Sequence, residues 1–85
     1  MTQASNYFIR RLEKGVRRRE KKARKVEAKI EKLRAKHSAG KITRAKLQQR
    51  LQVAESKIRV LRARIQTYRG AIGKERRKLE GKGTA

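Results

Sequence analysis

Apolar residues recur along this chain at alternating steps of three and four, and this spacing constrains the fold more than any other feature. The row runs from Ile9 to His37 in the first half and from Leu47 to Ile72 in the second, with Arg19 as its one strong polar break. Side chains at this spacing lie along one side of an α-helix and are buried when another helix packs against them. Pro is absent and helix-forming residues dominate, so both rows are predicted to be long helices.

The segment between the two apolar rows predicts a tight connection. Gly40 suits the left-handed backbone that ends many helices, and Thr43 suits the N-cap of the next helix. Ile42 before that cap and Leu47 four positions after it predict a hydrophobic staple. Because a short connection joins two long helices, they are expected to pack antiparallel.

This reasoning predicts an all-α fold, a long antiparallel two-helix coiled-coil hairpin with short basic tails. Folding about the turn places apolar residues opposite each other, from Leu33 with Leu47 to Ile9 with Ile72. The same repeat is compatible with a seam closed within one chain or between two chains. The expected boundaries are 1–80 for the hairpin, with helices at about 6–38 and about 44–80 and a turn at 38–43, followed by a flexible tail at 81–85.

The balance of charge points to a polyanionic partner. The chain has 28 Lys and Arg against 7 acidic residues, all of them Glu, and a formal net charge of +21. Repulsion at this density destabilises a compact isolated state, so a counter-charge is expected in the working structure. RNA and DNA are the abundant cellular polyanions. Membrane surfaces and acidic proteins are weaker candidates, and no apolar run is long enough to span a membrane.

The charged residues are distributed unevenly around the predicted helices. With Ile9 at heptad position a and Leu12 at d, the acids of the first helix fall at e and b, and they are Glu13, Glu20, Glu27 and Glu31. The c and g positions on the other side of the seam carry no acid in either helix. We call this side the basic flank; its cations are Arg11, Arg18, Lys22, Lys25, Lys29, Lys32 and Lys36 in the first helix and Lys46, Arg50, Lys57, Arg64, Lys74 and Lys78 in the second.

Antiparallel packing brings e positions near e positions and g positions near g positions. Glu20 is therefore expected to pair with Arg62, and Glu13 with Arg69, each pair contributing about a few tenths of a kcal/mol. On the basic flank only like charges meet, and they repel until an anion neutralises them. A row of such cations along a rod matches a row of phosphates.

The densest run of cations spans residues 17–25, with seven Lys and Arg in nine positions. We expect this run and the basic flank to contact nucleic acid, mainly through phosphates. A solvated face or a nuclear-localisation-like patch has the same composition. The contacts expected outside the basic flank are Arg17, Arg19, Lys21, Arg76 and Arg77.

Five uncharged residues carry separate expectations. Val53 and Val60 fall at position c among the cations, which predicts docking against a neighbouring protein or against unstacked bases, or else harmless surface valines. Tyr68 belongs to the apolar row and is expected in the core. Tyr7 and Phe8 lie near the open end, where they are expected to cap the seam, with stacking on a base as the alternative.

The sequence carries no Ser/His/acid set, no metal-ligand spacing, no Gly-rich phosphate loop and no Cys. We therefore expect neither enzyme activity nor a cofactor. His37 is expected to pack beside the turn or to contact a phosphate. The N-terminal segment lacks the apolar core of a secretory signal. Residues 1–19 are Arg-rich, as transit peptides are, but the whole chain has that composition.

In its size, absence of Cys, basicity and Lys/Arg-studded helices, as in residues 17–25 and Arg76-Arg77-Lys78, the chain resembles the small helical ribosomal proteins. The resemblance is one of general character and extends over the whole chain. It implies a structural role in packing ribosomal RNA, and a cytoplasmic location on the ribosome.

Three functions are therefore compared. The first is a ribosomal or ribosome-associated protein whose rod bridges RNA helices through phosphates and recognises shape. The alternative is a DNA-binding nucleoid protein that compacts DNA without sequence specificity. The third is a coiled-coil protein for an acidic partner, for which the basic flank is more basic than partner choice requires.

Overall fold

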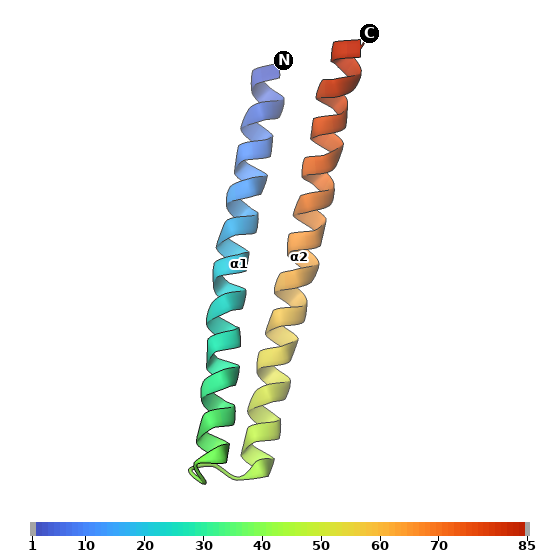
Figure 1. The fold of residues 1–85 in the computed structure, drawn as a ribbon. Coiled ribbons are helices and arrows are strands. Elements are labelled where there is room, and N and C mark those ends of the chain that lie inside the picture. Colours follow the sequence, from blue (N-terminus) through green and yellow to red (C-terminus); the bar gives the residue numbers. More distant parts are fainter. Residues whose placement is uncertain (1, 85) are drawn as a thin grey trace.

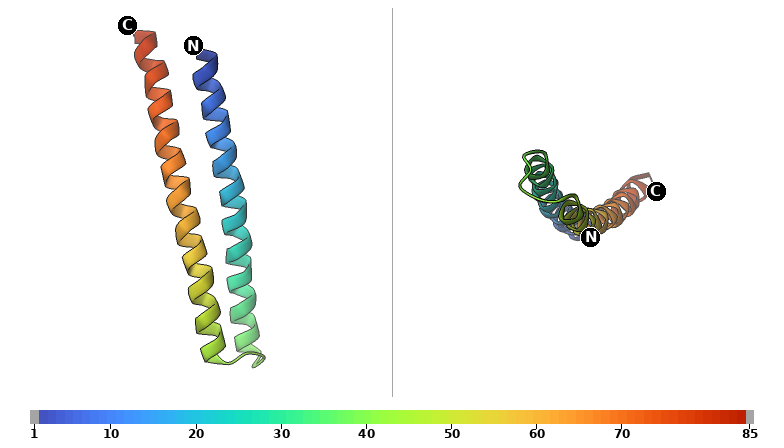
Figure 2. Two further views of the ribbon diagram at one scale, coloured as in Figure 1. Left: turned by 180° about the vertical axis from the view of Figure 1, so that it is seen from behind. Right: turned by 90° about the horizontal axis from the view of Figure 1, so that it is seen from below.

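The computed structural model describes residues 2–84, with side chains described for residues 6–81. Helix α1 spans Thr2–Ser38 and helix α2 spans Arg44–Thr84, and the described residues contain no strand. The two helices lie side by side and run in opposite directions, which confirms the predicted hairpin (Figure 1). The end-on view in Figure 2 shows that their axes are inclined to each other, as in supercoiled helix pairs.

Both helices are longer than the sequence predicts. Helix α1 begins at Thr2 rather than near residue 6, and α2 continues to Thr84 rather than ending near residue 80. Helix α2 therefore includes residues 81–84 of the expected tail, and residue 85 lies outside the described residues. A helix satisfies its own backbone hydrogen bonds, and a Gly inside it costs only about 1 kcal/mol, so Gly81 does not end α2.

The turn has the predicted glycine conformation. Gly40 has φ 75°, and its N–H donates to the carbonyl of His37 at 3.0 Å. The N–H of Lys41 donates to the carbonyl of Lys36 at 2.9 Å. Together these bonds form a Schellman motif, in which one left-handed residue lets carbonyls of the last helical turn find donors. The predicted role of Gly40 is confirmed.

The start of α2 is capped as predicted. The Thr43 hydroxyl accepts a hydrogen bond from the N–H of Lys46 at 3.3 Å, and the Thr43 carbonyl accepts the first helical bond from the N–H of Leu47 at 3.0 Å. Ile42 and Leu47 are both half-buried, as the predicted staple requires. The cap and the glycine together set the reversal that aligns the two apolar rows.

The core is a thin seam between the helices. Ile9, Val16, Ile65 and Ile72 form one buried cluster, which agrees with the predicted pairing of Ile9 with Ile72. Tyr68 packs against this cluster, as expected. No described side chain is fully buried, so the apolar burial is spread along the rod. The buried residues are Ile9, Val16, Ala23, Ala54, Ile58, Ile65 and Ile72.

Over the described residues, neither helix contains an apolar stretch that could cross a bilayer.

Ion pairs bridge the helices on the acid-bearing side, but the predicted pairs Glu20–Arg62 and Glu13–Arg69 are wrong. Each Glu instead reaches the Arg one heptad further along α2. Helical side chains lean toward the N-terminus of their own helix, so residues at the same level of an antiparallel pair lean apart. An Arg that starts further along α2 leans back toward the Glu. The observed pairs are Glu13–Arg76 at 3.1 Å, Glu20–Arg69 at 2.8 Å and Glu27–Arg62 at 3.3 Å.

Candidate nucleic-acid interface

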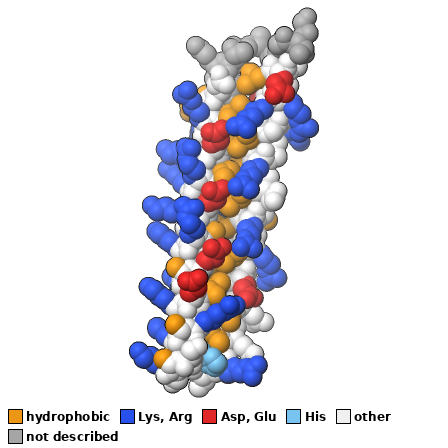
Figure 3. All heavy atoms as spheres, in the orientation of Figure 1, with side chains coloured by type: hydrophobic (Ala, Val, Ile, Leu, Met, Phe, Trp, Pro, Cys, Tyr) orange, Lys and Arg blue, Asp and Glu red, His pale blue; other side chains and the backbone are white. Residues whose placement is uncertain are grey.

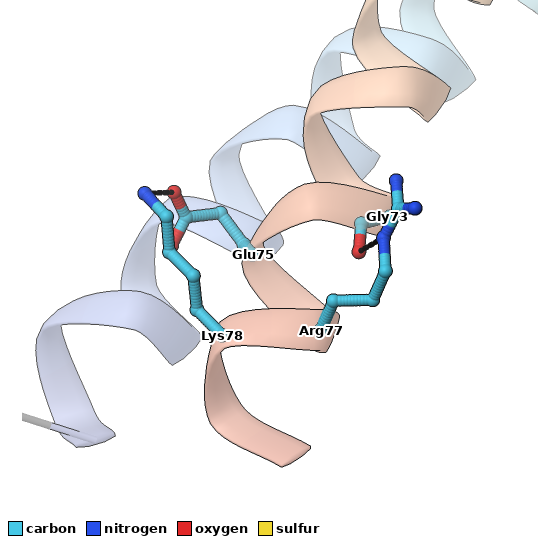
Figure 4. Close-up of polar contacts among 4 residues, drawn as sticks. All are labelled: Gly73, Glu75, Arg77 and Lys78. Carbon is cyan, nitrogen blue, oxygen red and sulfur yellow. Dashed lines mark hydrogen bonds and ion pairs between the residues drawn. The ribbon is translucent and has the colours of Figure 1, made fainter. Parts of the chain in front are cut away.

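The cations of the basic flank are all exposed, and they come from both helices. Their positions follow from the heptad repeat, because c and g residues lie beside the seam on the side opposite the interhelical ion pairs. The flank carries no acid of its own. At the open end, however, Lys78 is paired with Glu75 from a seam position, Nζ to Oε1 at 3.4 Å (Figure 4). The flank therefore presents its cations to solvent along the whole rod, with one of them paired locally.

Between the cations of this flank lie two shallow hollows with apolar floors. One, of about 460 Å³, is lined by Val26, Leu33 and Val53; the other, of about 520 Å³, is lined by Val26, Val60 and Leu61. Val53 is 58% exposed and Val60 is 53% exposed. The rims carry the positively charged side chains, which are Lys22, Lys25, Lys29, Lys32, Lys36, Arg50 and Lys57. An occupant would meet apolar surface at the centre and positive charge at the edges.

The other long face has a different character. Figure 3 shows acidic side chains alternating with Lys and Arg along the line between the helices. The interhelical Glu–Arg pairs described above belong to this face, so much of its positive charge is neutralised within the hairpin. The two faces of the rod therefore differ in charge.

The cations predicted outside the basic flank are dispersed around the rod. Arg17 lines a hollow with Glu13 and Glu20, and Arg76 is paired with Glu13, so both lie on the acid-bearing side. Lys21 is exposed at heptad position f, away from the seam. These residues are not brought together with the basic flank.

Two further predicted cations make contacts with glycine carbonyls. Arg77 donates from Nε to the carbonyl of Gly73 at 3.3 Å (Figure 4). Arg19 donates from Nη1 to the carbonyl of Gly15 at 3.2 Å and is half-buried at its seam position. The run at 17–25 therefore points its cations in several directions, and only part of it belongs to the basic flank.

Near the open end the structure brings together residues that the sequence reasoning separated. Tyr7 and Phe8 are 59% and 56% exposed, so the expectation that they cap the seam is wrong. Their rings instead line a hollow of about 810 Å³ together with Leu12, Gly15 and Tyr68, and we call it the open-end hollow. Tyr7 lies at heptad position f, which points away from the seam, whereas Phe8 lies at g, beside the seam.

The fold and the surface together define this protein as an antiparallel two-helix coiled-coil hairpin whose basic flank carries no acidic residue. Comparison of the chain with protein families, with known proteins and with solved structures found no match.

Proposed function

We propose that this protein binds RNA as a structural component, most specifically as a ribosomal or ribosome-associated protein that contacts ribosomal RNA phosphates along the basic flank. The observation that carries the proposal is the row of exposed cations that both helices contribute to a flank without acidic residues. Lys22 and Lys57 belong to this row and rim the same hollow. Bringing such charges side by side is unfavourable alone and becomes favourable when phosphates neutralise them and release bound counterions.

The shape of the flank favours RNA over DNA. The surface is two helices wide, whereas the major groove of B-DNA is about 12 Å wide and admits a single helix. An A-form RNA helix presents a wide, shallow minor groove with 2′-hydroxyls and phosphates on both sides. A broad basic surface suits that groove. Recognition of this kind reads helix shape rather than base sequence.

The proposal is tested first by charge removal on opposite sides of the rod. Replacing Lys22, Lys29 and Lys57 by Gln should weaken binding to an RNA duplex and flatten the dependence of log K on log salt. On B-DNA each phosphate that a protein neutralises contributes about 0.9 to the magnitude of this slope. By analogy, loss of three contacts should reduce the magnitude by about 2 to 3.

The matched control removes the same charge from exposed b positions, at Arg10, Arg24 and Arg59. It should change the affinity and the slope by much less. Equal effects of the two triple variants would place the RNA elsewhere and overturn the assignment to the basic flank. Binding that is tighter to a DNA duplex than to an RNA duplex of the same sequence would favour the nucleoid alternative.

A second test addresses the ribosome itself. The protein should sediment with ribosomal subunits in a sucrose gradient of cell extract, and the Lys22, Lys29 and Lys57 variant should move toward the free fractions at moderate salt. Release of the wild-type protein by DNase, with no response to RNase, would contradict the proposal.

A further inference from the structure

We infer that the open-end hollow binds an unpaired nucleotide of the RNA, with its base held by the rings of Tyr7 and Phe8, face to face with one and against the edge of the other. This inference rests on the proposed function and adds to it a recognition element that a basic rod lacks. It means that the preferred ligand is an RNA helix with an adjoining single-stranded segment, rather than a helix alone.

The rings are arranged for stacking on an external partner. Tyr7 and Phe8 contact each other edge to face, with centroids 6.3 Å apart and planes at 69°, and both are more than half exposed. Mutual packing in this geometry leaves ring surface open to solvent on both residues. Exposed aromatic rings are the usual platform on which proteins hold unpaired bases.

Cations surround the rings, and none of the described residues that line the hollow is acidic. The guanidinium of Arg11 lies 5.8 Å from the Tyr7 centroid, and Arg18 and Lys14 line the same hollow. A ligand that places a planar ring against the aromatics and an anionic group among these cations satisfies both features. A nucleotide has this combination of base and phosphate, and guanidinium planes also stack on bases.

The floor of the hollow depends on a glycine. In the g row of α1, Phe8 is followed by Gly15 and then by Lys22, so one side chain is missing beside the rings. A Cβ at Gly15 would lie 3.4 Å from Arg19 Nη1 and 3.6 Å from the Tyr68 ring. The glycine thus leaves open a space that any other residue would begin to fill. At about 810 Å³ the hollow has the size of small-molecule sites, about 300–1,000 Å³.

The experiment compares overhangs that differ only in their bases. One RNA duplex carries a single-stranded overhang of adenosines, a second carries an overhang of abasic residues with the same number of phosphates, and a third is blunt. The wild-type protein should bind the adenosine overhang about 5- to 150-fold more tightly than the abasic one, which corresponds to stacking of one base. Free adenosine monophosphate should compete only weakly, because it lacks the duplex phosphates that the rod contacts.

Variants then assign the effect to the hollow. Replacing Tyr7 and Phe8 by Leu should abolish the adenosine preference and leave affinity for the blunt duplex unchanged, whereas Tyr7→Phe, which keeps the ring, should retain it. Gly15→Leu should also abolish the preference by filling the space, and because it removes a helical glycine it should not lower helix content. Circular dichroism of each variant checks the fold.

The outcomes separate this inference from the proposed function. Equal wild-type affinity for adenosine and abasic overhangs overturns the hollow as a base site, even where duplex binding is strong. Ring-dependent binding of oligoadenylate by a protein that ignores the blunt duplex supports the hollow and overturns the duplex proposal. Ring-dependent binding of polyglutamate as tight as that of the overhang RNA makes the hollow a site for an acidic peptide and also overturns the inference.

Discussion

The guanidinium carbon of Arg19 lies 4.5 Å from the ring centroid of Tyr68 on the opposite helix. The same guanidinium donates to the Gly15 carbonyl at 3.2 Å. A cation over an aromatic face is attracted by the negative charge of that face. The contact explains how the apolar row accommodates its strongest polar break, because Arg19 pairs with the Tyr68 ring instead of being left alone at the seam.

We predict that Arg19 and Tyr68 are energetically coupled. A double-mutant cycle with Arg19→Met and Tyr68→Leu should give a coupling of about 0.5–2 kcal/mol, the range of cation–π contacts from exposed to desolvated sites. Urea unfolding at moderate salt measures it. The same cycle with Arg17→Met is the control and should give a coupling near zero. Equal coupling for Arg17 and Arg19 would show that charge alone, not ring contact, is responsible.

We predict that Glu20 is coupled to Arg69 and not to Arg62. Cycles with Glu20→Gln and each Arg→Gln should give about 0.2–1 kcal/mol for Arg69, as exposed ion pairs do, and nothing measurable for Arg62. Because Arg69 forms an ion pair within the hairpin, Arg69→Gln should lower the free energy of unfolding and change the RNA affinity less. A larger coupling of Glu20 to Arg62 would support the pair predicted from heptad positions and contradict the 2.8 Å contact of Glu20 with Arg69.

We predict that alanine has opposite effects at two glycines. Gly40 has φ 75°, so Gly40→Ala should cost about 1–2 kcal/mol from the left-handed backbone, although nothing lies near the added methyl group. Gly70 lies within α2 and also has open space, so Gly70→Ala should stabilise the hairpin by about 1 kcal/mol. Thermal or urea unfolding of the two variants gives the signs. Stabilisation by Gly40→Ala would mean that the turn has another backbone conformation in solution.

We predict that the free protein gains helix as salt increases from low to moderate concentration. Like charges such as Lys22 and Lys57 rim the same hollow, and screening relieves their repulsion. Circular dichroism at several salt concentrations measures the change, and added polyphosphate should have a similar effect at much lower concentration. Full helix content in low salt would contradict this expectation.

We predict that Val53 and Val60, which lie at position c and therefore further from the seam than Lys57, contact a neighbouring protein at the edge of the surface that the RNA covers. Both are exposed, so Val53→Ser and Val60→Ser should leave the helix content of the free protein unchanged. The double variant should retain its affinity for duplex RNA but sediment less completely with the particle. Loss of RNA affinity in the double variant would instead assign the valines to contacts with bases or sugars.

The heptad pattern was sufficient to predict much of this fold. The apolar row identified Tyr68 as a seam residue, and Gly40 and Thr43 identified the turn, because each of these features depends on local backbone preferences. Heptad position also separated the acid-free flank from the acid-bearing side. The helix ends were predicted less well, since Gly81 weakens a helix without stopping it.

The sequence by itself determined two helices, their turn and the rows that face each other, because helix periodicity and capping are local. Only the tertiary structure decided that Glu20 reaches Arg69 and that Arg19 rests on Tyr68, since these contacts depend on how far side chains lean and extend between antiparallel helices. It also decided that Tyr7 and Phe8 line an open hollow instead of covering the seam. The heptad position of a residue determines the side of the helix on which it lies, whereas the packing of the two helices determines which partner its side chain reaches.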